Sequence, residues 1–581
     1  MAGKQTELRG VLTRYRTAII TVALVSAVLN VIMLGGSFYM MLIYDSVLPS
    51  HSLATLAGLF VMVAVVYAFQ GLFDVGRARI LASIGEGFER QLGRRVQEAS
   101  GKMALQSGRV TGDGLMAMRD LDNIRSFLSG SGPGALLDLP WIVFFLGILT
   151  VLHYWLGLAA LVGAALLIGL TIFANRLSAE PTRQLGKLTA LRSGEAEASI
   201  RHAETIAALG MSEQMRDRWE EANGAYLAAN DRLSKTVISL GTISKVFRMF
   251  LQSLILTVGA LLVIKGEASG GVIFAASLLF GRALAPVDMA IANWRSFAAA
   301  RAGWNRLTEL FEQIPPTAEP HVQLPLPHQH LVVEGLTLVP PGGTMPTLHN
   351  VTFRATAGDA IGLIGPSGAG KTSLGRALVG IWQPHTGAVR LDGAALDQWE
   401  RGRLGRAIGY LPQSVELFEG TIAQNIARFT PYADSAAIIA AAREAGVHNL
   451  IVQLPQGYDT PVGRDGAQLS AGQRQRIGLA RALFGRPFLV LLDEPNSNLD
   501  QDGDLALERA IIAVRARGGI AIIIAHRPSL LAQTSHVMVL RDGRVQAFGP
   551  RDEILTKVLR PAPVSEQSLP APAHTNMEAV A

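Results

Sequence analysis

The chain has 581 residues, of which 49% are hydrophobic and 17% are charged, and its mean hydropathy is +0.30. A chain of this length and apolarity is too long for one ordinary domain and unusual for a soluble protein, so we expect a membrane portion. It contains no cysteine, which excludes disulfides, thiolate catalysis and cysteine metal sites. A formal charge of +6 would suggest nucleic-acid binding in a soluble chain, but here the positions of the charges matter more than their sum, and we expect no nucleic-acid partner.

The first half of the chain contains six long apolar runs. Most approach the ~20 residues that a membrane-spanning helix needs, which favours spanning helices over buried helices of a large soluble core. The runs are Ala18–Leu42, Leu53–Val75, Leu136–Leu152, Leu156–Ala174, Ile238–Ile264 and Val272–Trp294. Basic residues precede the first run, but the run is longer than the ~7 to 15 apolar residues of a signal peptide, so we predict a retained helix.

Lysine and arginine are unevenly distributed among the connections between these runs. The short connections Tyr44–Ser52 and His153–Trp155 contain neither, and Lys265–Gly271 contains one. The long connections Arg77–Gly134 and Arg176–Thr236 carry many, so we predict that they and both termini are cytoplasmic. Each long connection is rich in helix formers and is expected to form a helical hairpin, a stalk reaching roughly 40 Å beyond the membrane.

The composition changes after the sixth run. Residues 314–329 contain Pro315, Pro316, Pro320, Pro325 and Pro327, which predicts a linker. Beyond it, short apolar strands alternate with helices, the pattern of a parallel α/β domain. We predict a transmembrane domain over 1–313, this linker, an α/β domain over 330–559, and a disordered tail over 560–581 that is rich in Pro, Ala, Ser and Glu.

A phosphate-binding motif begins the α/β domain. The buried-strand pattern Ala360–Ile364 is followed by Gly365, Pro366, Ser367, Gly368, Ala369, Gly370, Lys371, Thr372 and Ser373, and then by a helical run. This is a P-loop in the strand-loop-helix context that it requires. Its backbone N–H groups close around phosphates at a helix N-terminus, Lys371 supplies positive charge, and Thr372 supplies a magnesium ligand. We therefore predict that these residues bind ATP with Mg²⁺.

A second apolar strand, Leu489–Leu492, ends in two acidic residues, Asp493 and Glu494. Asp493 is placed to hold hydrated magnesium, and Glu494 to orient or deprotonate the attacking water. The alternative is that the two acids only cap the next turn, which the upstream P-loop disfavours.

Between these motifs, the segment Leu469–Gln473 resembles the signature sequence of ABC ATPases. In that family the signature opens a helix whose N-terminus faces the γ-phosphate of ATP held by the partner domain. The resemblance therefore implies that Ser470, Gly472 and Gln473 bind nucleotide in trans, and that the chain acts as a homodimer.

The same resemblance assigns three further residues in family order. Gln413 matches the Q-loop glutamine that touches magnesium, Asp500 matches the D-loop aspartate of the nucleotide site, and His526 matches the switch histidine. The implied catalytic residues are Glu494, His526 and Gln413. Two departures stand out: Ala471 replaces the usual glycine of the signature, and residues 339–341 (Val-Pro-Pro) stand where many relatives have an aromatic residue that stacks on adenine.

Several other segments resemble the permease/ATPase of type I secretion, close to the PrtD/HasD-like branch that exports RTX-type proteins. They are Met40–Ser50, Arg119–Asp122, Asp138–Trp141, Gly281–Asp288 and Glu494–Asp500. The resemblance implies a multidomain membrane protein, with a six-helix all-α ABC exporter transmembrane domain followed by an α/β P-loop ABC ATPase domain. It also implies a bacterial inner-membrane location, a periplasmic membrane fusion protein and an outer-membrane channel as partners, and an unfolded polypeptide with a C-terminal uncleaved signal as cargo. Because only a short basic segment precedes the first run, we expect no leader-cleaving protease domain.

Other readings of function and of single residues stay open at this point. The chain could export lipids or small amphiphiles, or be an ATP-gated channel or regulatory subunit, although Glu494 and His526 argue against the latter. In the sixth run, Arg282 and Asp288 either face a passage for the polypeptide or pair between helices. Residues 120–125 and 210–213 are expected at the stalk tips that dock on the ATPase near Gln413.

Overall fold

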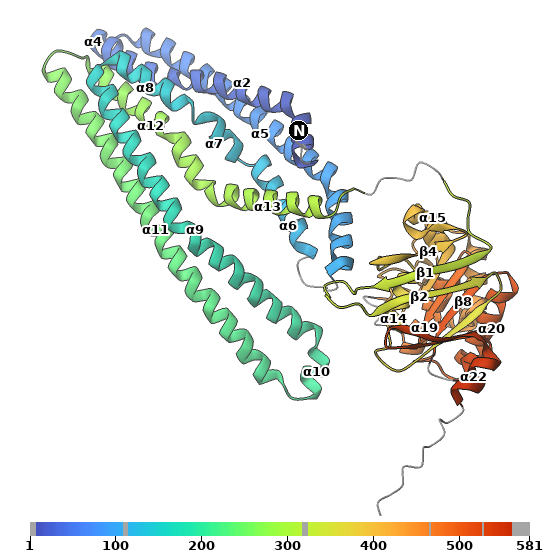
Figure 1. Ribbon diagram of the computed structural model, residues 1–581. Helices are drawn as coiled ribbons and strands as arrows, with labels where there is room; N and C mark the ends of the chain where they lie inside the picture. The colour runs from blue at the N-terminus through green and yellow to red at the C-terminus, as the bar shows by residue number, and fades with distance from the viewer. Residues whose placement is uncertain are drawn as a thin grey trace, which may run out of the picture. The chain divides into compact units, whose positions relative to one another are not determined.

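The computed structural model describes residues 7–107, 114–316, 323–463, 466, 468–525 and 528–559. The chain forms two compact units that divide between residues 316 and 317, one helical and one α/β (Figure 1). His526 and the predicted tail over 560–581 lie outside the described residues.

The described part of the helical unit contains five helices that are long and apolar enough to span a membrane, or six spans if a bent pair counts as one. The five are Arg16–Ser50, Leu53–Gln106, Tyr154–Arg201, Ser212–Ile264 and Gly270–Ala292. The bent pair is Gly132–Asp138 (α7) and Trp141–Leu152 (α8), which meet at 41°. The third predicted run is thus broken around Pro140, whose ring removes a helical hydrogen bond.

The described residues of the helical unit form the following elements. They are α1 (Glu7–Arg14), α2 (Arg16–Ile32), α3 (Leu34–Leu42), a π-helical turn (Ile43–Val47), α4 (Leu48–Ser50), α5 (Leu53–Ser107), α6 (Gly114–Ser129), α7, α8, α9 (Tyr154–Arg201), α10 (Ala203–Ala208), α11 (Ser212–Ile264), α12 (Gly270–Ala292) and α13 (Trp294–Gln313). Helices α5, α9 and α11 continue well past their apolar segments, so a spanning segment and its stalk form one helix. Helices α9 and α11 lie side by side and are joined through α10 (Figure 1).

One of the two predicted stalk tips is placed differently by the structure. Residues 210–213 lie at the turn between α10 and α11, where Gly210 has φ 66°. Residues 120–125 lie inside α6, and Asp120 is buried, with its carboxylate accepting 2.8 Å from Arg306 Nε of α13. The prediction for this segment was therefore wrong, because Asp120 fastens α6 to α13 instead of lying at a turn.

Two charged side chains inside the spans pair with each other. Asp288 of α12 forms an ion pair with Arg248 of α11, which supports the interhelical alternative for Asp288. Arg282 lies 3.9 Å from the sulfur of Met33. At the other end of α12, Asp45 of the π-helical turn accepts the backbone N–H of Gly271 at 2.8 Å and so joins the first span to the last.

The α/β unit contains two sheets and surrounding helices (Figure 1). Its strands are β1 (His330–Leu338), β2 (Leu348–Thr356), β3 (Ala360–Ile364), β4 (Thr386–Leu391), β5 (Ala394–Ala395), β6 (Ile408–Leu411), β7 (Leu489–Asp493), β8 (Ile520–Ile524), β9 (His536–Arg541) and β10 (Arg544–Pro550). Its helices are α14 (Lys371–Leu378), α15 (Arg401–Ala407), α16 (Ile422–Ile426), α17 (Ser435–Glu444), α18 (His448–Val452), α19 (Ala471–Leu483), α20 (Gln501–Ala516), α21 (Pro528–Leu531) and α22 (Arg551–Leu559).

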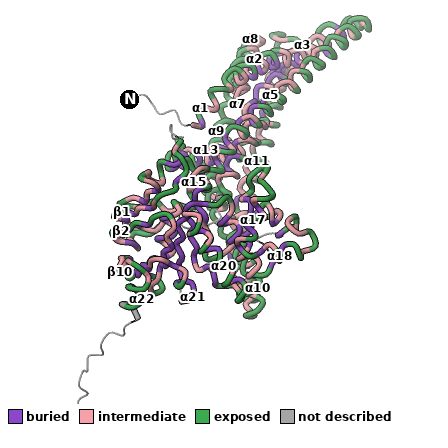
Figure 2. Tube along the Cα trace, turned by 90° about the vertical axis from the view of Figure 1, so that its right-hand side faces the viewer, coloured by how far each residue is buried: buried purple, intermediate pink, exposed green. Residues whose placement is uncertain are grey.

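The larger sheet has the order β10-β9-β3-β8-β7-β6 and is parallel except for β10. Its central strands are covered on both faces, which explains their continuous apolar sequences. Leu489 and Leu491 pack with residues of the antiparallel sheet β2-β1-β4-β5, whereas Val490 and Leu492 pack with residues of α16 to α20. Figure 2 shows buried residues concentrated in the middle of this unit, while the long helices of the other unit carry many exposed positions.

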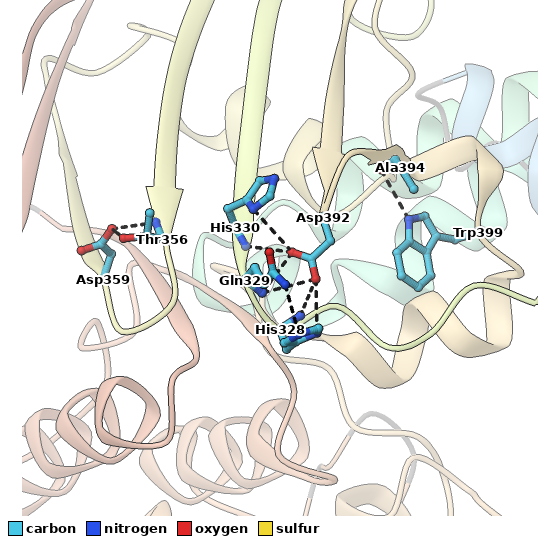
Figure 3. Close-up of polar contacts among 8 residues, drawn as sticks. All are labelled: His328, Gln329, His330, Thr356, Asp359, Asp392, Ala394 and Trp399. Carbon is cyan, nitrogen blue, oxygen red and sulfur yellow. Dashed lines mark hydrogen bonds and ion pairs between the residues drawn. The ribbon is translucent and has the colours of Figure 1, made fainter.

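Asp392 fastens the segment that leads into β1. Its carboxylate accepts the backbone N–H groups of His328, Gln329 and His330 at 2.7, 3.0 and 2.8 Å (Figure 3). Partial burial alone would raise the pKa of Asp392, but the three donors and the nearby His328 together hold that pKa below its ordinary value. A charged side chain in the β4–β5 turn thus helps to hold the entry of the chain into the α/β unit.

Candidate functional site

The predicted site residues follow strands whose carboxyl ends share one edge of the larger sheet. The P-loop follows β3, the Asp493–Glu494 pair ends β7, and Gln413 follows β6. Strands β6 and β7 are neighbours, and β8 lies between β7 and β3. Since ligands bind at the carboxyl ends of parallel strands in open α/β sheets, this edge is the candidate site.

The backbone of the P-loop depends on glycine, as Gly368 and Gly370 show. Gly368 has φ 81° and Gly370 has φ 96°, values that residues with a side chain rarely adopt. A Cβ on Gly370 would also lie 2.8 Å from Leu348 Cδ2, whereas one on Gly368 would meet open space. Helix α14 begins directly after Gly370, so its first N–H groups point toward the loop.

Lys371 is enclosed by the loop that it follows. Its ammonium donates to the carbonyl oxygens of Gly365 and Pro366 at 2.8 and 2.9 Å, and the residue is buried. Burial lowers the pKa of Lys371, while the nearby carboxylates of Glu494 and Asp493 oppose that shift. The loop therefore holds the Lys371 ammonium against its own carbonyl oxygens.

Thr372 and Asp493 lie together behind the loop. The two side chains share a hydrogen bond, and Asp493 is only 2% exposed. Burial raises the pKa of Asp493, and the hydrogen bond to Thr372 opposes the shift. One carboxylate oxygen, Oδ1, is buried without a hydrogen-bond partner. An unsatisfied buried acceptor beside a hydroxyl suits a hard cation or the water bound to it.

Gln413 and Glu494 lie in direct contact. Gln413 Nε2 donates to Glu494 Oε2 at 3.0 Å, and the Glu494 backbone N–H donates to Ile524 O at 3.0 Å. Glu494 has φ 48°, an uncommon value for a residue with a side chain, which the neighbouring strand β8 helps to hold. Strain at this position is typical of functional sites.

The signature segment opens helix α19 with a reciprocal cap. Ser470 Oγ accepts the N–H of Gln473 at 3.2 Å, and Gln473 Oε1 accepts the N–H of Ser470 at 2.9 Å. Ala471 is the first helical residue, so the missing glycine costs no unusual backbone conformation. Ser470 and Ala471 are exposed at the helix N-terminus.

Two residues that our sequence analysis did not single out, Gln475 and Arg476, connect the signature helix to the loop after β7. Gln475 is buried and donates to the carbonyl oxygen of Pro495 at 2.9 Å. Arg476 forms an ion pair with Asp500, which in turn accepts the N–H of Gly503 at 2.8 Å and caps α20. The polar residues at helical spacing after Ser470 were the only sequence signal for these contacts.

The predicted adenine region contains no aromatic ring among residues 339–341, as the sequence indicates. Here the chain turns, with the Gly343 N–H donating to Pro340 O at 2.9 Å. His526 follows β8 but lies outside the described residues. The structure thus brings together the P-loop, Asp493, Glu494 and Gln413 within the α/β unit.

Comparison with known proteins agrees with this architecture. Residues 19–287 match the family described as ABC transporter transmembrane region, and residues 348–497 match the ABC transporter family. A solved structure of a bacterial Atm1-family ABC exporter with ATP bound is similar in fold, with a TM-score of 0.79 and 24% identity over 94% of this chain and 96% of that chain.

Curated relatives match nearly the whole chain. It is 50% identical over 566 residues to the type I secretion system ATP-binding protein PrsD of Rhizobium meliloti (strain 1021), covering 97% of both chains. It is 28% identical over 552 residues to the alpha-hemolysin translocation ATP-binding protein HlyB of Escherichia coli, covering 94% of this chain and 77% of the relative.

The chain is therefore an ABC transporter, a multi-pass membrane protein whose transmembrane domain and ATP-binding, ATP-hydrolysing domain share one polypeptide. Within that class it belongs to the ATP-binding proteins of type I secretion systems.

Proposed function

We propose that this chain is the motor of a type I secretion system, a homodimer that hydrolyses ATP to export an unfolded polypeptide. The observation that carries the proposal is the 50% identity to a type I secretion ATP-binding protein across 97% of both chains. The proposed transmembrane domain comprises residues 1–313 and the ATPase domain residues 330–559, joined by the linker 314–329.

In the proposed site, the P-loop binds the phosphates of ATP, with Lys371 neutralising their charge. Thr372, Asp493 and Gln413 would hold Mg²⁺, and the unpartnered Oδ1 of Asp493 supports this assignment. The described part of the chain has no group of three His, Cys, Asp or Glu side chains that could hold a metal ion, so phosphate and water oxygens would complete the metal's ligands. When bound, the ion neutralises charge on the transferred phosphoryl group.

Glu494 is the proposed base or orienting group for the attacking water, and Gln413 positions its carboxylate through their 3.0 Å hydrogen bond. His526 is proposed to act beside them as the switch histidine. The nucleotide-binding site is completed in trans by Ser470, Gly472 and Gln473 of a second copy. The exposure of the α19 N-terminus supports this arrangement. Asp500 contributes from the adjoining loop.

The proposed location is the bacterial inner membrane, with both termini, the stalks and the ATPase domain in the cytoplasm. The charge distribution supports this orientation, because the long connections are basic and the short ones are not. The proposed partners are a periplasmic membrane fusion protein and an outer-membrane channel, and the proposed cargo class is RTX-type polypeptides with a C-terminal uncleaved signal.

Secretion of an RTX-type protein tests the proposal in cells that also express the fusion protein and the outer channel. Export is expected with the wild-type chain and not with Glu494→Gln, which should lower ATP hydrolysis by about 10²- to 10⁴-fold while retaining ATP binding. Glu553→Gln, which changes an exposed glutamate of α22 in the same way, is the control and should export normally. Equal export by Glu494→Gln would contradict the role of Glu494, and absent export by an active wild type would contradict the cargo class.

A further inference from the structure

A cavity of about 430 Å³ lies within the helical unit, between α9, α12 and the break that separates α7 from α8. Most of its wall is apolar: Ile168 and Ile172 come from α9, Val287 and Ile291 from α12, and Leu139 from the break. Its volume falls within the roughly 300 to 1,000 Å³ that is usual for small-ligand sites. A ligand with a long apolar portion fits such walls, since a small water-soluble ion would leave them facing water.

Polar side chains form a small part of the lining. Asn175 and Arg176 line the cavity from α9, and Trp294 lines it from the start of α13. Arg176 directly follows the apolar segment of α9, and Trp294 directly follows the break at the end of α12. Tryptophan and basic residues are enriched at the boundary between a membrane and water. Arg176 and Trp294 therefore place the cavity near this boundary, with a cation in its lining.

The charge of Arg176 is available to a ligand. Within the described part of the chain, Arg176 forms no ion pair. In contrast, Arg248 of α11 and Asp288 of α12 are paired with each other. Basic pockets between membrane-spanning helices on the cytoplasmic side bind anionic lipid headgroups. An apolar wall and an available guanidinium are the two features that such a lipid requires.

We propose that this cavity is a binding site for an anionic phospholipid of the cytoplasmic leaflet. The phosphate lies at Arg176 and Asn175, and an acyl chain lies against Ile168, Ile172 and Val287. The assignment of the leaflet rests on the proposed orientation, but the site itself does not depend on which polypeptide is exported.

Native mass spectrometry of the full-length protein, purified with equal amounts of phosphatidylglycerol and phosphatidylcholine, tests the proposal. The wild type is expected to retain phosphatidylglycerol, and Arg176→Gln to retain about five-fold less, as for loss of one basic contact to an anionic surface. Arg79→Gln is the control, because Arg79 is exposed on α5, follows an apolar segment in the same way and does not line the cavity. Equal retention by the wild type and Arg176→Gln, or equal losses in both variants, would overturn the proposal.

The absence of cysteine allows a second test of what occupies the cavity. Ile172→Cys gives the full chain a single thiol on the cavity wall, to which a benzophenone maleimide can be attached. In nanodiscs of phosphatidylglycerol, irradiation is expected to add the mass of one lipid. Cross-linking to a second copy in the nanodisc, or to the exported polypeptide in secreting cells, in place of the lipid adduct would overturn the proposal.

Discussion

Arg476, in the second turn of the signature helix, is paired with Asp500, the residue that caps helix α20. The Asp500 carboxylate also accepts the N–H of Gly503, and this donor, together with Arg476, lowers the pKa of Asp500. One carboxylate therefore connects the helix that opens with Ser470 to the loop that follows Glu494. Both segments are proposed to serve the nucleotide sites. The Arg476–Asp500 pair is therefore placed to keep their relative positions fixed.

Replacement of Arg476 by glutamine should lower ATP turnover more than it lowers stability. Asp500 would keep its cap on α20 through Gly503, and because its carboxylate is exposed, we expect the loss of the pair to lower the free energy of unfolding by only about 1 kcal/mol. Turnover should fall by about ten-fold, because misplaced groups reduce rates strongly. Arg551→Gln, which removes the exposed Arg551–Asp552 pair, is the control and should leave turnover unchanged. Equal turnover in the two variants would contradict a positioning role for Arg476.

Two glycines of the P-loop should respond differently to alanine. Both Gly368 and Gly370 have positive φ, so each substitution should cost about 1 to 2 kcal/mol of backbone strain. Only at Gly370 would the new Cβ crowd Leu348 and the carbonyl oxygen of Thr347, adding about 1 to 3 kcal/mol. Thermal unfolding without nucleotide should show Gly370→Ala to be the less stable variant. The same loss of stability in both would mean that the neighbours of Gly370 move aside at little cost.

The parts of this fold that could be predicted from sequence are those specified by local pattern. Strands β3 and β7 are continuous apolar runs that end at a glycine and at an acid, so their bounds and the adjoining P-loop and Asp493 were accessible without a structure. The place of Gln413 at the same edge of the larger sheet followed from its match to the Q-loop glutamine of ABC ATPases. Its hydrogen bond to Glu494 needed coordinates.

The features that sequence could not supply are contacts between distant segments. The pairing of Asp120 with Arg306 connects residues 186 positions apart. Sequence analysis placed Asp120 at a stalk tip, whereas the structure places it in a buried contact between two helices. The break at Pro140 lay inside an apolar run whose only charged residue is Asp138. Hydrophobicity predicts that such a run spans the membrane but does not predict whether it bends.

Asp392 should make the stability of the α/β unit depend on pH. Its pKa is held below the ordinary 3.8, so its stabilising effect is fully present above that value and is lost as the pH falls through the folded-state pKa. Asp392→Asn should lower the unfolding temperature at pH 7, because the amide lacks the charge that favours three N–H donors. Calorimetry of the full chain should show this difference shrinking below about pH 4. A difference that stays constant down to pH 3 would contradict the role of the charge.

Arg77 and Asp138 should behave as a coupled pair. Arg77 donates to Asp138 at 2.9 Å and to Ser26 Oγ at 3.2 Å, and Asn30 donates to the other oxygen of Asp138 at 2.9 Å. Asp138 ends α7, so this network holds the bend of the third span against α2 and α5. Both charged side chains are about one-fifth exposed, so removing Arg77 should leave Asp138 poorly compensated. Removing Asp138 leaves Arg77 with Asp74, at 3.0 Å, as its remaining carboxylate partner.

We expect Arg77→Gln and Asp138→Asn each to destabilise the helical unit by about 2 kcal/mol, less than for a fully buried pair. The double variant should lose at least about 1 kcal/mol less than the sum, as measured by thermal unfolding in detergent. The exposed pair Arg90–Glu86 provides the matched control, since Arg90→Gln and Glu86→Gln should have small, additive effects. Additive losses at Arg77 and Asp138 would show that the two side chains act independently, and the bend at Pro140 would then have to be held by packing alone.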